Sequence, residues 1–493
     1  MFFAMVQRME SRHTLFALIT LFISFGMSPC VAEKANATAT GIAEVKTHPA
    51  KMNWWLDDKF GLFIHWGPSS VAGVEIGWAR ESHPFDHPGK LELMPDAEYD
   101  ALYKQFNPVD FDADQLVRTA KAAGMKYLVF TAKHHDGFSN WATELTDYNI
   151  MNAPYGRDIC KELADAVHKH GLKLGWYYST RDWSHPDYLV GDNSKYNDYY
   201  HGQIRELLSN YGQVDVLWFD HVAGKWSDYR FEELFEMIYD LQPQILVNNR
   251  AAKFVMRHQA GKPSPELVAL TKGDYETPEG KIGNFRVDYP WETCMPMSKG
   301  ADGHGGWSYR PNAVPATFEA CVQMLAACVT GGGNLLLNIG LMPSGNVRAE
   351  ELANFKALKP WMDTYGESIY RTRAGPYVSG QWGGACIKDD VVYLHVFQWT
   401  DGLLSLPALP RQVLHCEALG GEAVSFTQDA DALTVTLGKF KARSLRNVFT
   451  PKERTLHHVI KLTLAPGADI ALIPVEGHVA KKQHGTLVNP MGE

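Results

Sequence analysis

Residues 158–179 read DICKELADAVHKHGLKLGWYYS, and this stretch joins a helical pattern to a strand pattern. A helix is predicted over Asp158–His170, because apolar side chains recur there every three or four residues and the first residue is a typical N-cap. Gly171 stands where a helix C-cap is expected. The following run, Leu172–Ser179, is apolar almost throughout, which is typical of a parallel strand covered on both faces. The stretch is therefore one helix–strand unit of an α/β fold.

The same alternation continues on both sides, from about residue 52 to residue 366. Further strands are predicted at Phe60–Trp66, Tyr127–Lys133, Val214–Asp220, Gln244–Asn249 and Asn334–Ile339. Further helices are predicted at Asp112–Ala123, Gly202–Tyr211, Phe231–Leu241, Ala316–Val329 and Arg348–Tyr365. Repeated β-α units of this total length favour a (β/α)₈-like TIM barrel. An open doubly wound sheet is the alternative, although no GxGxxG motif of a dinucleotide-binding fold follows any strand.

Beyond Tyr370 the apolar runs become short, alternating and separated by Gly, Pro or Asp, which predicts an all-β C-terminal sandwich. Its strands are expected at Val391–Trp399, Ala423–Thr427, Leu433–Leu437, His458–Leu464 and Asp469–Val475. The basic stretch Lys439–Arg454 is interpreted as a solvated insertion. The expected organisation is a signal peptide (1–32), the barrel (33–366), the sandwich (367–476) and a polar tail (477–493).

The first 32 residues have the parts of a secretory signal peptide: a basic flank, the short apolar run Leu15–Phe25, and small residues before Glu33. The run is shorter than the ~20 apolar residues of a membrane span, so an uncleaved anchor is the weaker alternative. We therefore expect a secreted or periplasmic protein without a membrane span after signal removal. Six cysteines remain, and none shows CxxC spacing, so free buried thiols are expected.

The charge balance narrows the classes of partner. The chain of 493 residues carries 47 basic and 56 acidic side chains, a formal net charge of −9. No nucleic-acid partner is expected, because phosphate binding normally requires a basic surplus. The sequence makes no prediction of an oligomeric state.

Polar and aromatic residues gather where the predicted strands end, which is where barrels of this type carry their active sites. Imidazoles, carboxylates and a guanidinium hydrogen-bond to hydroxyls, flat rings pack on apolar sugar faces, and no phosphate cradle is present. The set predicts a site for a neutral sugar. Apart from Trp176, expected in the core, the tryptophans near strand ends are predicted to line one pocket: Trp66, Trp78, Trp141, Trp183, Trp218, Trp291 and Trp307.

Asp220 stands at the end of the apolar run VDVLWF, where a carboxylate either caps the next helix or takes part in catalysis. Glycoside hydrolysis needs two carboxyl groups, one ionised and one protonated. Candidates for the second are Glu276, Glu279 and Glu292, and sequence spacing does not choose among them.

A metal site at the tandem residues His134 and His135 with Asp136 is disfavoured. Neighbouring residues on a strand point to opposite faces and rarely bind one ion together. No metal is therefore expected, and hydrogen bonding to ligand hydroxyls is the favoured role of the two histidines.

Eight motifs occur in order near the ends of successive predicted strands: FGLFIHWG (60–67), KHHDGF (133–138), GWYYS (175–179), WFD (218–220), NNR (248–250), DYETPE (274–279), WE (291–292) and LLLNIGLMPSG (335–345). With these motifs the chain resembles the α-L-fucosidases of family 29 of the glycoside hydrolases, from about Trp54 to Gly345. The resemblance implies a retaining, exo-acting enzyme with a (β/α)₈-like barrel and a C-terminal β-sandwich. It also implies no cofactor, and a fucosylated oligosaccharide or glycoconjugate as the partner.

Carried over residue by residue, the resemblance implies that Asp220 is the nucleophile and Glu279 the general acid/base. The sugar-binding positions match His65, Trp78, His134, His135, Tyr177, Trp218, Arg250 and Trp307. One position departs from the family pattern. Many members have a glutamate directly before the tryptophan that matches Trp78, and here that residue is Gly77, with Glu75 two residues earlier.

Two other functions remain open at this point. One is a related retaining glycosidase or transglycosylase with a different sugar specificity, because recognition of a methyl group rests on a few wall residues. The other is a non-catalytic fucose-binding protein on the same scaffold, although such a protein would need neither of the two carboxylates.

Overall fold

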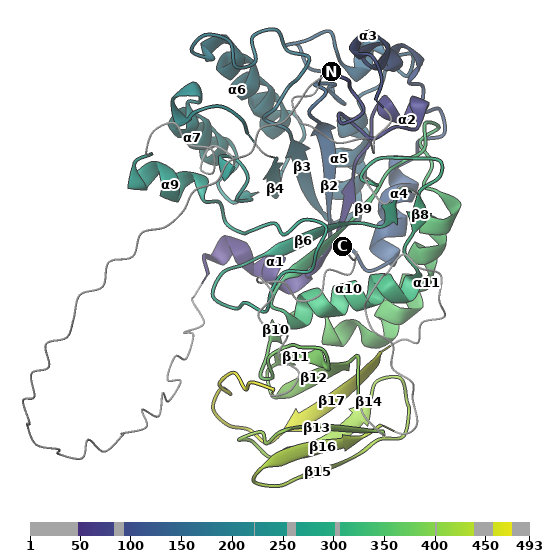
Figure 1. The fold of residues 1–493 in the computed structure, drawn as a ribbon, viewed down its shortest axis with the longest axis vertical. Coiled ribbons are helices and arrows are strands. Elements are labelled where there is room, and N and C mark those ends of the chain that lie inside the picture. The colour runs from purple at the N-terminus through teal and green to yellow at the C-terminus, as the bar shows by residue number, and fades with distance from the viewer. Residues whose placement is uncertain are drawn as a thin grey trace, which may run out of the picture. The chain divides into compact units, whose positions relative to one another are not determined.

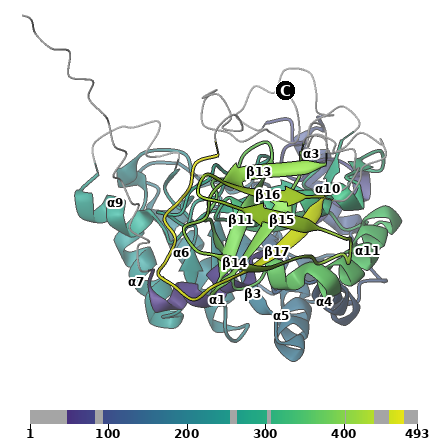
Figure 2. The same ribbon diagram turned by 90° about the horizontal axis from the view of Figure 1, so that it is seen from below.

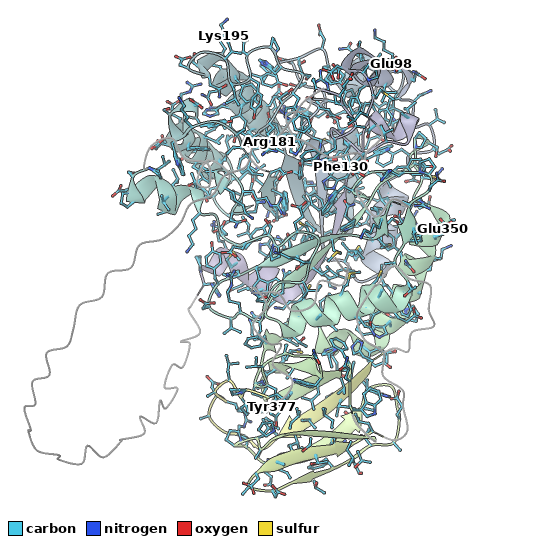
Figure 3. The ribbon with its side chains drawn as sticks, viewed as in Figure 1. Glu98, Phe130, Arg181, Lys195, Glu350 and Tyr377 are labelled. Carbon is cyan, nitrogen blue, oxygen red and sulfur yellow. The ribbon has the colours of Figure 1, made fainter. Side chains whose placement is uncertain are left out.

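The computed structural model describes residues 48–82, 93–220, 222–253, 263–300, 306–399, 402–437 and 457–475. The predicted signal peptide, the basic stretch 439–454 and the polar tail lie outside the described residues. Side chains are drawn in Figure 3, where Phe130 belongs to the barrel and Tyr377 to the C-terminal β-domain. Both of these side chains are fully buried.

Seven parallel strands form the larger sheet, in the order β5-β4-β3-β2-β1-β9-β6 (Figure 1). The strands are β1 (Phe60–Ile64), β2 (Tyr127–Lys133), β3 (Lys173–Tyr178), β4 (Val216–Phe219), β5 (Leu246–Val247), β6 (Glu292–Pro296) and β9 (Asn334–Ile339). All six predicted barrel strands are confirmed. Strand β6 was not predicted as a strand, because it is short and contains Glu, Thr and Pro in place of an apolar run.

Residues 274–279 fill the gap between the edge strands β5 and β6. On the β5 side, the amide of Asp274 donates to Val247 O (2.7 Å) and that of Asn249 donates to Tyr275 O (3.0 Å). On the β6 side, the amide of Glu292 donates to Glu276 O at 2.8 Å, and the bridges on both sides are parallel. The segment therefore completes a (β/α)₈-like barrel and carries Glu279 to the edge where the parallel strands end.

The helices surround this sheet and follow the predicted pattern (Figures 1 and 2). The longer helices are α4 (Ala113–Ala122), α5 (Ile159–His170), α6 (Ser194–Ser209), α7 (Phe231–Leu241), α10 (Phe318–Thr330) and α11 (Ala349–Tyr365). The short ones are α1 (Asn53–Asp58), α2 (Ser69–Ala72), α3 (Asp96–Ala101) and α9 (Pro265–Thr271). Asp158 caps α5 as predicted, accepting a hydrogen bond from the amide of Lys161 at 2.8 Å. Helix α6 begins at Ser194, earlier than the predicted start at Gly202. The prediction missed the first two turns because they bury tyrosines instead of aliphatic residues.

Two antiparallel sheets form the C-terminal β-domain. One has the order β10-β11-β12-β17-β14 and the other β13-β16-β15. Their strands are β10 (Arg373–Ala374), β11 (Gly383–Lys388), β12 (Val391–Val396), β13 (Leu403–Pro407), β14 (Val413–Ala418), β15 (Ser425–Gln428), β16 (Ala432–Thr436) and β17 (His458–Leu464). A strand over Asp469–Val475 was predicted wrongly, since only Ile473 makes a bridge there, with Tyr377. One buried apolar cluster joins residues of both sheets, as in a sandwich.

Two short strands, β7 (Ser298–Lys299) and β8 (Val314–Pro315), form a separate antiparallel sheet. No helix in the described ranges is long and apolar enough to cross a membrane. The six predicted thiols are free, and five of them are buried: Cys160, Cys294, Cys321, Cys328 and Cys386, with Cys416 partly exposed.

Candidate active site

The side chains predicted from the strand ends lie together at the carboxyl-terminal edge of the barrel. Strand geometry explains part of the grouping: Trp218 and Asp220 are two residues apart and share a face, and Trp218 pairs in register with Tyr177 of β3. Hydrogen bonds and ring contacts connect all ten predicted site residues into one group: His65, Trp78, His134, His135, Tyr177, Trp218, Asp220, Arg250, Glu279 and Trp307.

The carboxylate of Asp220 is held by two donors. Tyr177 Oη donates to Oδ2 at 2.6 Å, and Arg250 Nη1 donates to Oδ1 at 3.1 Å. His135 Nε2 lies 3.5 Å from Oδ2. Burial, together with the neighbouring Asp220, raises the pKa of Tyr177 well above its usual value, so its hydroxyl remains a donor. The side chain of Asp220 is 12% exposed, which leaves it a small open face toward the site.

Arg250 links the two predicted catalytic carboxylates. Asp220 Oδ1 (3.1 Å) and Glu279 Oε2 (2.8 Å) contact the same nitrogen, Arg250 Nη1, so these two oxygens lie within about 6 Å of each other. Thr277 fixes the rest of the guanidinium, because Nε donates to its Oγ1 (2.6 Å) and Nη2 to its carbonyl (3.0 Å). The guanidinium also packs 4.6 Å from the ring centroid of Trp218. The pair is thus positioned by one rigid cation.

The two rival glutamates lie elsewhere. Glu276 pairs with Arg286 at 2.9 Å on the outer side of its segment. Glu292 begins β6, at the opposite end of the barrel strands, and accepts a hydrogen bond from Tyr127 Oη at 2.5 Å. Burial raises the pKa of Glu292 to about 7. Of the three candidates, Glu279 is therefore the one that the fold brings next to Asp220.

His65 presents an acceptor to the site. Burial lowers the pKa of His65 to about 4, so the ring is neutral at neutral pH. The amide nitrogen of Asn338 donates to Trp307 O (2.7 Å), which turns its Oδ1 toward His65 Nδ1 (2.6 Å). Nδ1 must therefore carry the proton, and Nε2 is left as the acceptor. Asn338 was not among the predicted site residues; its signal is an amide within the apolar strand NLLLNI.

His134 and His135 do not point to opposite faces as the strand argument assumed. Their ring centroids are 4.2 Å apart, because β2 ends at Lys133 and the alternation ends with it. With Asp220 they form a group whose ligand atoms lie within 4.8 Å of one another, a spacing that a metal ion could bridge. The guanidinium of Arg250, 3.1 Å from Asp220, opposes a second cation there. The donor set therefore fits ligand hydroxyls better than a metal.

The structure divides the tryptophans into two sets. Trp78, Trp183, Trp218 and Trp307 belong to the site; Trp78 contacts Trp183 with a centroid distance of 5.3 Å. The prediction of one pocket was wrong for Trp66, Trp141 and Trp291. These three side chains, like that of Trp176, are almost fully buried on the helix-facing side of the barrel. Position at a strand end does not decide between the two faces, because a shift of one residue reverses the direction of the side chain.

The departure at residue 77 has a steric explanation. Gly77 has a left-handed φ of +69°, and a Cβ there would lie 2.7 Å from His134 Nδ1. Glu75 is 3% exposed. Its carboxylate accepts hydrogen bonds from three successive backbone amides, of Gly306 (2.8 Å), Trp307 (3.1 Å) and Ser308 (3.1 Å). Glu75 therefore holds the loop that carries Trp307.

Replacing this carboxylate by an amide should loosen that loop. We expect Glu75→Gln to lower the free energy of unfolding by about 1–3 kcal/mol, because the side-chain NH₂ cannot accept from the buried amides. The KM for a sugar substrate should rise more than kcat falls, because Trp307 is a wall and not a reacting group. Thermal unfolding and steady-state kinetics measure both effects, with exposed Glu98→Gln on α3 as the control. An unchanged KM would contradict the role of Glu75.

Comparisons with known proteins agree on one family. A sequence model of the family described as Alpha-L-fucosidase matches residues 28–367. Human plasma α-L-fucosidase is 29% identical over 389 residues, covering 73% of this chain and 79% of the relative. α-L-Fucosidase isoenzyme 1 from Paenibacillus thiaminolyticus is 31% identical with a TM-score of 0.72, covering 85% of this chain and 99% of that one. A trapped covalent intermediate of the Bacteroides thetaiotaomicron enzyme with 2-fluoro-fucosyl fluoride, obtained with a Glu-to-Gln mutant, is 25% identical with a TM-score of 0.68, covering 85% and 97%.

Proposed function

This chain belongs to the α-L-fucosidase family, and on that basis we propose that it is an exo-acting, retaining enzyme that removes terminal α-L-fucose from glycans through a covalent glycosyl-aspartate. One observation carries the proposal: Asp220 and Glu279 share the same nitrogen of Arg250. Retaining glycosidases place their two carboxyl groups ~5–5.5 Å apart and inverting ones ~6.5–9.5 Å apart. The separation of about 6 Å or less between the two oxygens that contact Arg250 supports the retaining class.

In the first step Asp220 attacks the anomeric carbon while the carbon–oxygen bond to the leaving group breaks. Glu279 donates its proton to the departing oxygen, so the leaving sugar departs as a neutral alcohol. In this structure Glu279 contacts Arg250 instead. Its side chain is 43% exposed, so it has room to exchange that contact for the glycosidic oxygen when substrate enters.

In the second step water attacks the same carbon from the side that the leaving group vacated. Glu279, now a carboxylate, takes a proton from this water, and the bond to Asp220 breaks. Arg250 and Tyr177 remain bonded to Asp220 and stabilise the carboxylate that is released. Two inversions at one carbon return the original α configuration.

Sugar recognition follows from the remaining contacts. His65 Nε2 accepts from a hydroxyl, and the paired histidines and Trp78 line an adjacent part of the site. Trp307 lies 5.0 Å from the His65 ring and offers an apolar surface for a methyl group. These contacts suit a deoxy sugar that has hydroxyls on one side and a methyl group on the other.

The test compares 4-nitrophenyl α-L-fucoside with the corresponding aryl galactoside and follows the first-formed sugar by NMR. We expect faster hydrolysis of the fucoside and initial release of the α anomer. Preference for the galactoside would favour the alternative of a related glycosidase with a different sugar specificity. Initial release of the β anomer would contradict retention, and fucose binding without hydrolysis would favour a non-catalytic binding protein.

A further inference from the structure

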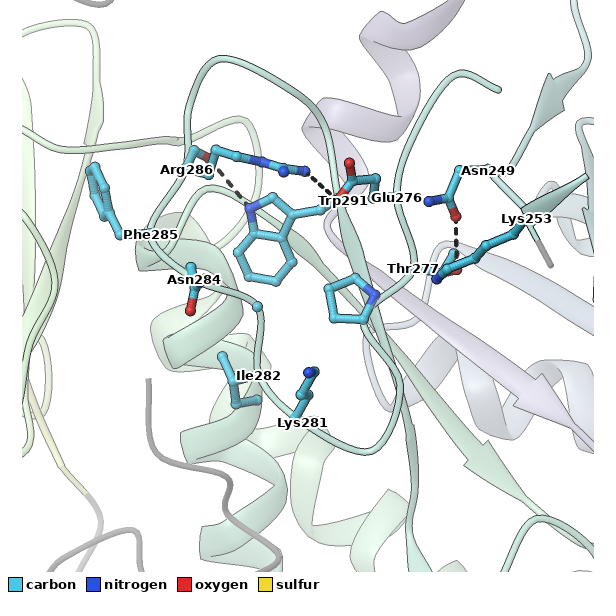
Figure 4. Close-up of a pocket in the computed structure, with 12 residues that line it drawn as sticks. Asn249, Lys253, Glu276, Thr277, Lys281, Ile282, Asn284, Phe285, Arg286 and Trp291 are labelled. Carbon is cyan, nitrogen blue, oxygen red and sulfur yellow. Dashed lines mark hydrogen bonds and ion pairs between the residues drawn. The ribbon is translucent and has the colours of Figure 1, made fainter. Parts of the chain in front are cut away.

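A pocket lies on the outer side of the segment that carries Glu279, across the barrel wall from the active site. It has a volume of about 380 Å³ and is formed between residues 276–278 and the loop 281–286 (Figure 4). Asn249 and Lys253, which follow β5, complete one wall. The half-buried Phe285 and the buried Trp291 also border the pocket.

The polar lining of this pocket is mainly cationic. Lys253, Lys281 and Arg286 contribute three positive charges, against the single carboxylate of Glu276. Glu276 already pairs with Arg286 at 2.9 Å. The lining therefore retains an excess of positive charge in a protein whose formal net charge is −9. Cations beside an aromatic ring suit a sugar ring that carries an anionic substituent.

The pocket shares a wall with the catalytic site. Thr277 Oγ1 donates to Asn249 Oδ1 (3.2 Å) at the pocket and accepts from Arg250 Nε (2.6 Å) on the barrel side. The residues Glu276, Thr277 and Pro278 directly precede Glu279, which faces the leaving group in the proposed reaction. The pocket therefore meets the catalytic site at this segment, on the side of the wall that faces away from Asp220.

We propose that this pocket binds an anionic group, a sulfate ester or a carboxylate, on the leaving-group side of the fucosylated glycan. The proposal rests on the fucosidase function and specifies a substrate class for it. Lys253 and Lys281 provide the attraction. An aryl fucoside is too short to reach these residues and should not respond to changes in them.

The experiment measures kcat/KM for three fucosylated oligosaccharides of one backbone: unsubstituted, sulfated, and carrying a carboxylate sugar. For the native enzyme we expect about fivefold higher kcat/KM with at least one anionic substrate than with the neutral one, the size expected of partly exposed ion pairs. Comparing kcat/KM for the sulfated substrate with that for the carboxylate substrate shows which of the two anionic groups the pocket binds. The preference should fall at 0.5 M salt, because exposed charge pairs are screened.

The double variant Lys253→Gln, Lys281→Gln should abolish this preference while hydrolysis of the aryl fucoside stays unchanged. Lys356→Gln, an exposed lysine of α11, is the matched control and should keep the preference. Equal kcat/KM for all three substrates, or a preference that survives the double variant, would overturn the inference about the pocket. Absence of hydrolysis of every fucoside, the aryl one included, would instead contradict the proposed function.

Discussion

Asp220→Gly is expected to lower turnover of an aryl α-L-fucoside by several orders of magnitude, because the variant lacks the atom that attacks the anomeric carbon. Removal of the carboxylate leaves space beside Tyr177 and Arg250, which are the donors that held it. Azide should enter this space and restore part of the rate. Since azide would then displace the leaving group directly, the product should be the β-fucosyl azide, identified by NMR.

Two controls separate chemistry from folding in this experiment. The thermal unfolding midpoint of the variant should confirm that it is folded, and Asp192→Gly, at an exposed aspartate, should retain full activity. Near-normal hydrolysis by Asp220→Gly would show that another group is the nucleophile.

Glu279→Ala should show an effect that depends on the leaving group. A natural fucosyl linkage needs proton donation, and its hydrolysis should fall by several orders of magnitude. An activated aryl fucoside leaves without a proton, so its first step should be affected far less, and the covalent intermediate should accumulate as a burst. Azide should then attack the intermediate and yield the α-fucosyl azide, the opposite anomer to that expected from Asp220→Gly.

The pH dependence of kcat/KM is an independent test of the role of Glu279 as the general acid. The limb that reports the general acid in the native enzyme should disappear in Glu279→Ala. Glu236→Ala, at an exposed glutamate of α7, is the control and should keep both limbs. An equal loss on natural and activated substrates, without azide rescue, would argue that Glu279 does not transfer the proton.

Much of the fold could be predicted from local patterns. The six predicted barrel strands are present because long apolar runs need cover on both faces, and such cover is what a parallel sheet provides. Strand β6 and the segment 274–279 were missed as parts of the barrel. Their positions depend on hydrogen bonds to neighbours distant in sequence, such as that from Asn249 to Tyr275 O, and not on their own composition.

The residue types of the site were predictable in the same way, because polar groups that end apolar strands must converge at one edge of a barrel. The directions of the tryptophan side chains were not predictable. Trp218 lies within β4 and faces the barrel interior, whereas Trp291 directly precedes β6 and packs on the helix-facing side. Asn338 and Glu75 were also missed as parts of the site. Each acts by holding another residue, and such a role exists only once the chain is folded.

The sequence by itself determined the α/β barrel, the all-β C-terminal region and the set of side chains that meet at the strand ends, because periodicity and strand direction are local properties of the chain. Only the tertiary structure showed that Glu279, which the family resemblance had implied, lies beside Asp220, and why residue 77 is a glycine. Those outcomes depend on which distant segments become neighbours: residues 274–279 enter the barrel wall, and the ring of His134 occupies the space that a Cβ at residue 77 would need.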